Sequence, residues 1–318
     1  MQKKQLGNSD LNITSLGFGA WAIGGAGWEF SWGPQDDKKS IEAIHRALEL
    51  GINWIDTAAV YGCGHSEEVV AKALNEWRDE KPYIFTKCVL RWDNNGKVFQ
   101  NYKPESLSQE CEDSLRRLNT DVIDLYQLHW PPDKNEALID GAWEMMARLK
   151  DEGKVRWIGV SNFNIEQMKR ALKINPITSL QPPYSLINRN IEAEILPFCK
   201  EQNIGVIVYS PMASGLLTGA MTRERIENLS AEDWRLRWEE FKEPKITKNL
   251  GLAEKLKKIG KTHNATAGEI AISWTLKHPA VTGAIVGARS AAQVDGVMNV
   301  RSFKLDEDEV NELEAHFS

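Results

Sequence analysis

Residues 35–88, QDDKKSIEAIHRALELGINWIDTAAVYGCGHSEEVVAKALNEWRDEKPYIFTKC, alternate twice between a helical pattern and a short apolar run. Ile41, Ile44 and Leu48 recur at a spacing that places them on one face of a helix. We interpret the two short apolar runs as strands. Helices are expected at 35–50 and 66–77, and strands at 53–58 and 83–88. This order is typical of a parallel sheet covered by helices.

The same alternation extends along the whole chain. Strands are expected at residues 15–21, 53–58, 83–88, 123–129, 155–161, 179–184, 205–210 and 283–288. Eight such units in 318 residues fit an α/β fold of the (β/α)8 TIM-barrel type better than a doubly wound open sheet. No linker rich in Gly, Ser or Pro interrupts the pattern, so residues 1–318 are expected to form one domain.

Composition and charge exclude several classes of protein. The chain is 42% hydrophobic and 26% charged, which is typical of a globular protein. Its net charge of -6 and its lack of a basic run argue against nucleic acid or an anionic membrane as a partner. No apolar run approaches the roughly 20 residues of a membrane span. The start of the chain has no apolar signal segment, so a cytoplasmic protein is expected, either a monomer or a homo-oligomer.

Metal binding and disulfide chemistry are not expected either. The four Cys are far apart and form no C-x-x-C motif, so we interpret them as reduced packing thiols. The six His show no metal-ligand spacing.

A glycine motif near the N-terminus resembles a dinucleotide fingerprint but lacks its context. Gly17-Phe-Gly19-Ala-Trp-Ala22 matches G-x-G-x-x-A. The fingerprint requires a helix directly afterwards and an acidic residue about 20 residues further on. A glycine-rich loop follows instead, so we reject a Rossmann fold. The glycines are expected to allow close approach of the backbone at a strand end.

Polar residues interrupt the apolar pattern where several strands end. Asp56, Lys87 and His129 each close a predicted strand, and Tyr61 follows Asp56 in the next loop. Alone, each has a structural explanation: a helix cap, a lysine that reaches solvent, or a loop histidine. Together they would meet at the C-terminal mouth of a barrel, where barrel enzymes carry their active sites. Burial of Lys87 beside Asp56 is costly unless the two charges pair.

This constellation suggests reduction of a carbonyl group without a metal. A Tyr hydroxyl has a pKa near 10, and we expect the Lys87 cation to lower that pKa at Tyr61 while Asp56 keeps Lys87 protonated. Tyr61 could then protonate a carbonyl oxygen as hydride reaches the carbon, and His129 would hydrogen-bond the same oxygen. A lyase that uses Lys87 as a Schiff base is the alternative, but Asp56 opposes it because an ammonium is not nucleophilic.

The ordered motifs resemble the aldo-keto reductase superfamily along nearly the whole chain. Its G-x-x-x-x-D-T-A-x-x-Y-G segment is similar to Gly51-Ile-Asn-Trp-Ile-Asp56-Thr-Ala-Ala-Val-Tyr61-Gly. Further matches are Ile84-Phe-Thr-Lys87, Asp124-Leu-Tyr-Gln-Leu-His129-Trp-Pro, Gly159-Val-Ser-Asn-Phe163, Gln181 and Tyr209-Ser-Pro-Met-Ala-Ser-Gly-Leu-Leu217. The branch that includes bacterial members and potassium-channel β-subunits looks most similar. The resemblance implies an N-terminal β-hairpin and extra C-terminal helices around the barrel.

The resemblance also implies an NADP(H)-dependent reductase of aldehydes or ketones. Its catalytic tetrad would be Asp56, Tyr61, Lys87 and His129, with Asp56 also near the cofactor. The cofactor side would comprise Gly19, Ala20, Trp21, Ser161, Asn162, Gln181, Tyr209, Ser210, Pro211, Ser214, Gly215, Leu217, Gly287, Arg289 and Gln293. Within this set Tyr209 would stack on the nicotinamide and Arg289 would pair with the adenosine 2′-phosphate.

Two positions depart from the resemblance, and both concern the cofactor. Many members have Lys where this chain has Gly287, and Glu-Asn where it has Gly296-Val297. We therefore expect a preference for NADPH by a reduced margin, with NADH as a weaker alternative. A second hypothesis, suggested by the channel-associated members, is an NADP(H)-binding regulatory or redox-sensing subunit with slow turnover.

Tryptophan is unusually frequent, with twelve residues against six Tyr and nine Phe. Several lie in predicted loops at the catalytic mouth, where flat aromatic walls suit a small-molecule carbonyl or sugar substrate. The predicted substrate-binding residues are Trp21, Trp28, Trp32, Trp92 and Trp130. The long segment after the seventh strand could add Trp234 and Trp238.

Overall fold

The computed structural model describes residues 3–300 and 302–317, and its centre is a closed barrel of parallel strands. In chain order the barrel strands are β3 (Leu16–Gly19), β4 (Trp54–Asp56), β5 (Tyr83–Cys88), β8 (Ile123–Leu128), β9 (Val155–Ser161), β10 (Ser179–Gln181), β11 (Gly205–Val208) and β12 (Val281–Gly287). Each strand pairs with the next in parallel, and β12 closes the ring on β3. The predicted (β/α)8 barrel and its eight strands are confirmed.

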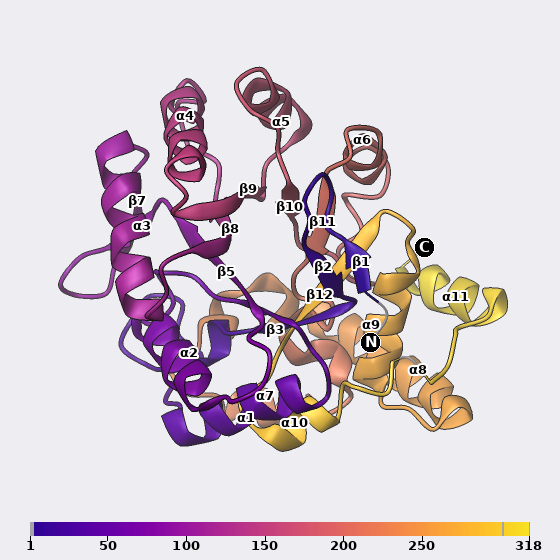
Figure 1. The fold of residues 1–318 in the computed structure, drawn as a ribbon. Coiled ribbons are helices and arrows are strands. Elements are labelled where there is room, and N and C mark those ends of the chain that lie inside the picture. The colour runs from indigo at the N-terminus through magenta and orange to yellow at the C-terminus, as the bar shows by residue number, and fades with distance from the viewer. Residues whose placement is uncertain (1–2, 301, 318) are drawn as a thin grey trace.

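Helices surround this barrel, as Figure 1 shows. They are α1 (Asp37–Glu49), α2 (His65–Glu76), α3 (Pro104–Leu118), α4 (Leu138–Asp151), α5 (Ile165–Leu172), α6 (Ile195–Glu201), α7 (Arg223–Glu227), α8 (Lys245–His263), α9 (Ala267–Lys277), α10 (Ala291–Asp295) and α11 (Glu307–Glu314). The two halves of the quoted segment form as expected. Asp36 caps α1 through the N–H groups of Lys38 and Lys39. The expected C-terminal helices are also present.

The predicted strand at 179–184 is shorter in the sheet than expected. It ends at Gln181 because Pro182 and Pro183 lack the N–H groups that a strand donates. Pro183 contributes only an isolated bridge to Tyr209.

An N-terminal hairpin closes one end of the barrel. Its strands are β1 (Lys3–Gln5) and β2 (Asn12–Thr14), which lie beside β11 and β12 in Figure 1. Leu6, Leu11 and Ile13 pack with Trp54 and other side chains inside the barrel. The hairpin therefore covers the apolar interior at the N-terminal end, and the opposite end remains for loops.

A second hairpin, β6 (Leu90–Trp92) with β7 (Val98–Gln100), was not expected from the sequence. Its turn carries Asn95-Gly96, a dipeptide that favours tight hairpin turns and was a usable signal. Gly96 has φ of +73°, and a side chain there would collide with the backbone of Gly27. The hairpin extends β5 over the catalytic mouth.

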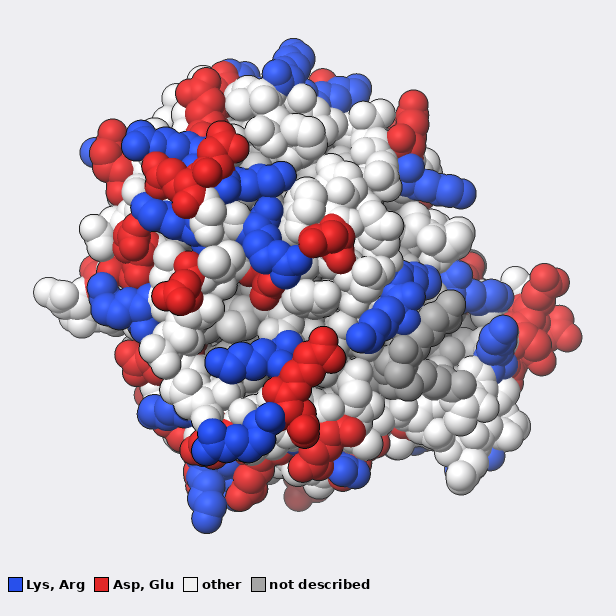
Figure 2. All heavy atoms as spheres, viewed as in Figure 1, with Lys and Arg blue, Asp and Glu red and all other residues white. Residues whose placement is uncertain are grey.

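The outer surface carries interspersed positive and negative side chains on the face drawn in Figure 2. Among the described helices, none combines the length and apolar character needed to cross a bilayer.

Gly17 in β3 faces the indole of Trp54, and a Cβ at Gly17 would overlap that ring. We expect Gly17→Ala to lower the free energy of unfolding by about 1–3 kcal/mol, because the buried ring has no room to move. Gly141→Ala in α4 is the control, since its Cβ would meet only ordinary contact, at 3.7 Å from Pro104. That change should stabilise the protein by up to about 1 kcal/mol. Urea titration measures both, and equal midpoints would contradict the packing argument.

Candidate active site

A buried ion pair lies at the C-terminal ends of two neighbouring strands. Lys87 of β5 places its Nζ 2.6 Å from Oδ2 of Asp56, the last residue of β4. The same ammonium donates to the carbonyl oxygen of Thr57 at 2.8 Å and to the hydroxyl of Tyr61 at 3.3 Å. The two charged side chains are almost completely buried. The ammonium thus has three partners, which lowers the cost of its burial.

The environment of Tyr61 corrects one expectation. Burial and the negative charge of Asp56 raise the pKa of Tyr61 well above its usual value. The expected lowering by Lys87 is therefore wrong, because desolvation of a phenolate outweighs one nearby cation. Burial also lowers the pKa of Lys87, while the charges of Asp56 and Glu67 raise it. At neutral pH the Tyr61 hydroxyl therefore keeps its proton.

His129 is neutral and stands next to Tyr61. Burial, and after it the positive charge of Lys87, lowers the pKa of His129 well below its usual value. The two rings meet edge to face with centroids 5.6 Å apart. Nδ1 of His129 is buried without a hydrogen-bond partner within residues 3–300 and 302–317. An unsatisfied buried polar atom of this kind marks a place where a ligand can bond.

Polar side chains from three more strands continue this site. Gln181 donates to Oδ1 of Asp56 at 2.8 Å, and the Ser161 hydroxyl donates to the Gln181 carbonyl oxygen at 2.8 Å. Tyr209 donates to Oδ1 of Asn162 at 2.8 Å, and Asn162 donates to the carbonyl oxygen of His129 at 3.1 Å. The predicted cofactor residues of β9, β10 and β11 are therefore linked to the tetrad by hydrogen bonds.

A cavity of about 840 Å³ joins these groups. Asp56, Tyr61 and His129 line it, whereas Lys87 lies behind them. The predicted cofactor residues that line it are Gly19, Trp21, Asp56, Ser161, Asn162, Gln181, Tyr209, Ser210, Pro211, Ser214, Gly215, Gly287, Arg289 and Gln293. Ala20 and Leu217 do not line it. They are fully buried, and Ala20 instead bonds Asp56 through its backbone N–H.

The backbone after β11 forms a concave turn along this cavity. Ser210, Ala213, Ser214 and Gly215 all have positive φ, between 46° and 97°. Left-handed residues in a cluster make a concave backbone turn of the kind that can hold an anion. Here the N–H groups of Ala213 and Gly215 already donate within the turn, to the carbonyl oxygens of Ser210 and Met212. Arg235 also lines the cavity and is paired with Asp233 at 2.6 Å.

Arg289 reaches the loop between β3 and α1. Its Nε donates to Oε1 of Gln35 at 2.7 Å, and its guanidinium also donates to the carbonyl oxygens of Trp32 and Pro34. Burial lowers the pKa of Arg289, and the nearby Arg235 contributes in the same direction. Its hydrogen-bond partners are neutral oxygens, so no anion in direct contact cancels its positive charge.

Aromatic rings cover the catalytic end of the cavity. Trp21, Trp28, Trp32 and Trp130 line it as predicted, but Trp92 does not and packs beside them. Trp21 stacks on Tyr61 with centroids 6.1 Å apart and also on Trp234 at 4.8 Å. Trp234 belongs to the helical turn η3 (Trp234–Arg237), and its backbone N–H donates to the carbonyl oxygen of Ser31. Sequence patterns did not reveal this contact.

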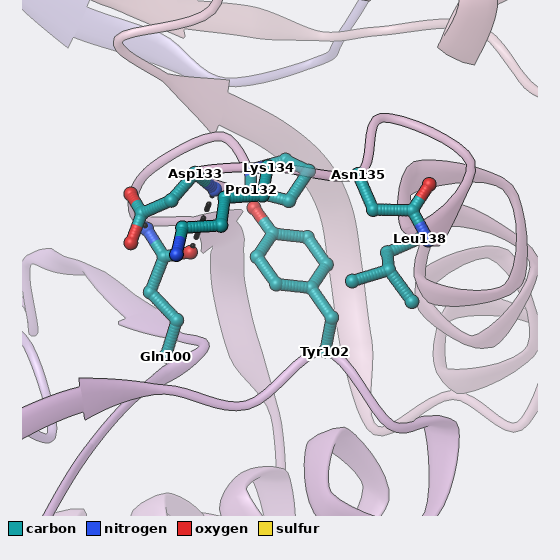
Figure 3. Close-up of a pocket in the computed structure, with 7 residues that line it drawn as sticks. All are labelled: Gln100, Tyr102, Pro132, Asp133, Lys134, Asn135 and Leu138. Atoms are coloured by element: carbon teal, nitrogen blue, oxygen red, sulfur yellow. Dashed lines mark hydrogen bonds between the residues drawn. The ribbon is translucent and has the colours of Figure 1, made fainter.

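A second, smaller cavity of about 290 Å³ adjoins the mouth and shares Gln100 and Asp133 with the first. Figure 3 shows Tyr102 rising between this pair and Leu138. Gln100 of β7 and Asp133 bond each other twice, each at 3.1 Å. This pair fixes the unexpected hairpin against the loop that follows His129. Neither residue was predicted as part of the site, because the two are 33 residues apart in the chain and come together only in the folded barrel.

Known proteins are similar to this chain over nearly its whole length. The model of the family described as "Aldo/keto reductase family" matches residues 15–317. An aldo-keto reductase of Bacillus subtilis (strain 168) is 36% identical over 98% of this chain and 92% of its own length. The NADH-specific methylglyoxal reductase of Escherichia coli (strain K12) is 33% identical over 92% and 91%. The structure of a glycerol dehydrogenase from Gluconobacter oxydans matches with a TM-score of 0.88, 37% identity and coverage of 99% and 95%.

Removing one partner of the buried ion pair tests its energetics. We expect Asp56→Asn to lower the free energy of unfolding by about 3–5 kcal/mol, because the Lys87 ammonium is left buried without a counter-charge. The double variant Asp56→Asn/Lys87→Met should recover part of that loss. Glu152→Gln, which removes the charge of a surface carboxylate paired with Arg148 and Lys154, is the control and should cost about 1 kcal/mol or less. If urea unfolding gives equal losses of unfolding free energy for Asp56→Asn and Glu152→Gln, the Lys87–Asp56 pair does not behave as a buried ion pair.

Proposed function

The chain belongs to the aldo/keto reductase family, and on that premise we propose that it reduces aldehydes or ketones to alcohols with NADPH. One observation carries the proposal. The Tyr61 hydroxyl lies 3.3 Å from the Lys87 ammonium and beside His129, on the wall of the large cavity. This is the geometry of a proton donor next to a space where a small carbonyl compound fits.

Each side chain has a distinct part in the proposed reaction. A nicotinamide held in the cavity would supply the hydride that the carbonyl carbon accepts. As the C=O double bond becomes a single bond, the Tyr61 hydroxyl gives its proton to the oxygen. Lys87 stabilises the resulting phenolate, and Asp56 holds Lys87 in place. Neutral His129 donates a hydrogen bond to the same oxygen and orients it.

The residues along the cavity fit a nicotinamide dinucleotide. The concave backbone at Ser214 and Gly215, with Arg235 beside it, suits a pyrophosphate. Asn162, Gln181 and Ser161 offer an amide-binding set near the tetrad, and Tyr209 offers a flat ring. Nε1 of Trp32 is a buried donor without a partner among residues 3–300 and 302–317, as expected where a ligand completes the site.

Selection of NADPH over NADH would depend on Arg289. Its guanidinium is half-buried at the far end of the cavity, and its neighbours are neutral oxygens. Gly287 supplies no second cation there. A related reductase in Escherichia coli is named NADH-specific, so the margin in favour of NADPH is expected to be modest.

The substrate site we propose is the aromatic end of the cavity. Trp21 and Trp28 both lie beside Tyr61, with centroids 6.1 Å away. Glycerol and methylglyoxal appear in the names of related enzymes, which supports a small oxygenated substrate. Exposed Trp130, with Gln100 and Asp133 nearby, provides a face on which hydroxyl-bearing compounds can stack and bond.

The first test removes only the proposed proton donor. Tyr61→Phe should lower kcat for carbonyl reduction by at least about a thousandfold while NADPH binding is retained, since the phenol contributes its proton only in the transition state. Tyr126→Phe is the control, because Tyr126 is also buried but does not line the cavity, and its hydroxyl has no hydrogen-bond partner in the described part of the chain. Absorbance of the reduced nicotinamide measures turnover. A Tyr61→Phe protein with wild-type activity would exclude the acid role.

A wild-type protein that binds NADPH but turns over no carbonyl in a broad panel would favour a regulatory subunit instead.

The second test concerns the 2′-phosphate. Arg289→Ala should weaken NADPH binding by roughly tenfold to a hundredfold and leave NADH binding nearly unchanged, because only NADPH carries the dianion that the guanidinium would meet. Gln35→Ala is the control for the hydrogen bond between Arg289 and the β3–α1 loop. It removes that bond but keeps the guanidinium, so it should change the affinities for NADPH and NADH alike. Quenching of Trp fluorescence measures each Kd. Equal losses for the two cofactors in Arg289→Ala would rule out the phosphate assignment.

A further inference from the structure

A second buried ion pair lies directly behind the catalytic strand. Glu67, near the start of α2, has a completely buried side chain. Its Oε2 accepts from Nε of Arg117 in α3 at 2.7 Å, and its Oε1 accepts from the Thr86 hydroxyl at 2.6 Å. Each carboxylate oxygen therefore accepts one hydrogen bond, one from a cation and one from a strand residue.

Thr86 connects this pair to the active site. It immediately precedes Lys87 on β5, and successive side chains of a strand point to opposite faces. Lys87 contacts Asp56 on the inner face, so Thr86 contacts Glu67 on the outer face between the barrel and its helices. A displacement of Thr86 would move the backbone that carries Lys87.

The neighbouring residue Ser66 anchors the same end of α2 to two other strands. Its hydroxyl lies 2.9 Å from the Thr57 hydroxyl and donates to the Ala20 carbonyl oxygen at 2.8 Å. Thr57 is the residue whose carbonyl oxygen accepts from Lys87. The start of α2 thus holds the ends of β3, β4 and β5 together around the ammonium.

The charges around Lys87 are balanced as two pairs, Lys87 with Asp56 and Arg117 with Glu67. The groups that face Lys87 are Asp56, Tyr61 and His129 from inside and Glu67 from outside, and those near Glu67 are Arg117, Cys111 and Tyr126. Burial lowers the pKa of Lys87, and the negative charges of Asp56 and Glu67 oppose that effect.

A buried ion pair is not an efficient source of stability, because apolar side chains of equal volume often stabilise a core more. Its presence behind β5 therefore calls for another role. Glu192 shows what a purely structural counterpart looks like. It too accepts from a hydroxyl, that of Tyr184, and pairs with Arg189, but it is partly exposed, and neither partner is next to a tetrad residue in the chain.

We propose that Glu67 is a positioning residue for the reduction: through Thr86 it fixes the strand that carries Lys87, and its charge favours the ammonium form of that lysine. The inference rests on the proposed function, because the tetrad acquires its role there. It extends the charge network of the site from the inner to the outer face of the barrel wall.

The test removes the charge and keeps the hydrogen bond. In Glu67→Gln we expect kcat to fall at least about fivefold while KM changes less than about twofold. The alkaline limb of the rate profile should move to lower pH by about half a unit or more, because Lys87 loses its proton earlier. Glu192→Gln is the matched control. It should lower the unfolding midpoint without moving kcat or the alkaline limb.

Glu67→Gln leaves the Arg117 guanidinium without its counter-charge, and this could prevent the variant from folding. Companion variants keep the test decisive in that case. Glu67→Gln/Arg117→Met removes both charges and should show a smaller shift in the same direction, because loss of the Arg117 cation offsets part of the loss of the Glu67 charge. Thr86→Val cuts the link and should lower kcat, whereas Thr86→Ser keeps the hydroxyl and should restore most of the loss. A folded Glu67→Gln protein with the wild-type kcat and pH profile would overturn the proposal, as would an equal shift in Glu192→Gln.

A readout without catalysis separates this inference from the proposed function. Heteronuclear NMR of the Lys87 ammonium, assigned with Lys87→Met, should show deprotonation at lower pH in Glu67→Gln than in the wild type. If the wild-type protein is active and Lys87 titrates at the same pH in Glu67→Gln as in the wild type, the role of Glu67 is refuted and the proposed function stands. A wild-type protein that reduces no carbonyl refutes the proposed function, and the Lys87 titration still decides the charge effect.

Discussion

The buried ion pair between Lys87 and Asp56 is the interaction on which the site depends. Removing either charge from water costs several kcal/mol, and only the close contact between the two repays that cost. The contact requires β4 and β5 to lie side by side in the register that places Asp56 opposite Phe85, two residues before Lys87, and the closed barrel enforces this register. The ammonium has one remaining direction for a hydrogen bond, and Tyr61 occupies it. The barrel geometry therefore sets the position of the proposed proton donor.

Polar contacts extend from this pair on both sides of the barrel wall. On the inner face Gln181 bonds Asp56, and through Ser161 it joins the part of the cavity that suits a nicotinamide. On the outer face Thr86 connects β5 to Glu67 and Arg117. Buried polar groups of this number weaken a core, and proteins retain them where function needs them. Here both sets converge on the lysine beside Tyr61.

The mouth of the barrel is built from segments that are distant in the chain. The β3–α1 loop carries Trp28 and Trp32, and it meets Trp234 from the segment after β11. Arg289 bonds the same loop from the end of β12. Trp21 stacks on both Tyr61 and Trp234, so one continuous aromatic wall runs from the tetrad toward the cofactor end. The proposed substrate and cofactor surfaces are thus joined through tryptophan side chains.

Local sequence patterns were sufficient for the order of strands and helices and for Asp56, Lys87 and His129, because periodicity and polar strand ends are properties of short segments. The β6–β7 hairpin was missed although Asn95-Gly96 signalled its turn. The raised pKa of Tyr61 could not be read from its neighbours, since desolvation depends on how completely distant loops cover the ring. The sequence by itself thus determined the barrel and the residues at its mouth. Only the tertiary structure decided their ionisation and which tryptophans form the wall, because burial and contact are set by segments far apart in the chain.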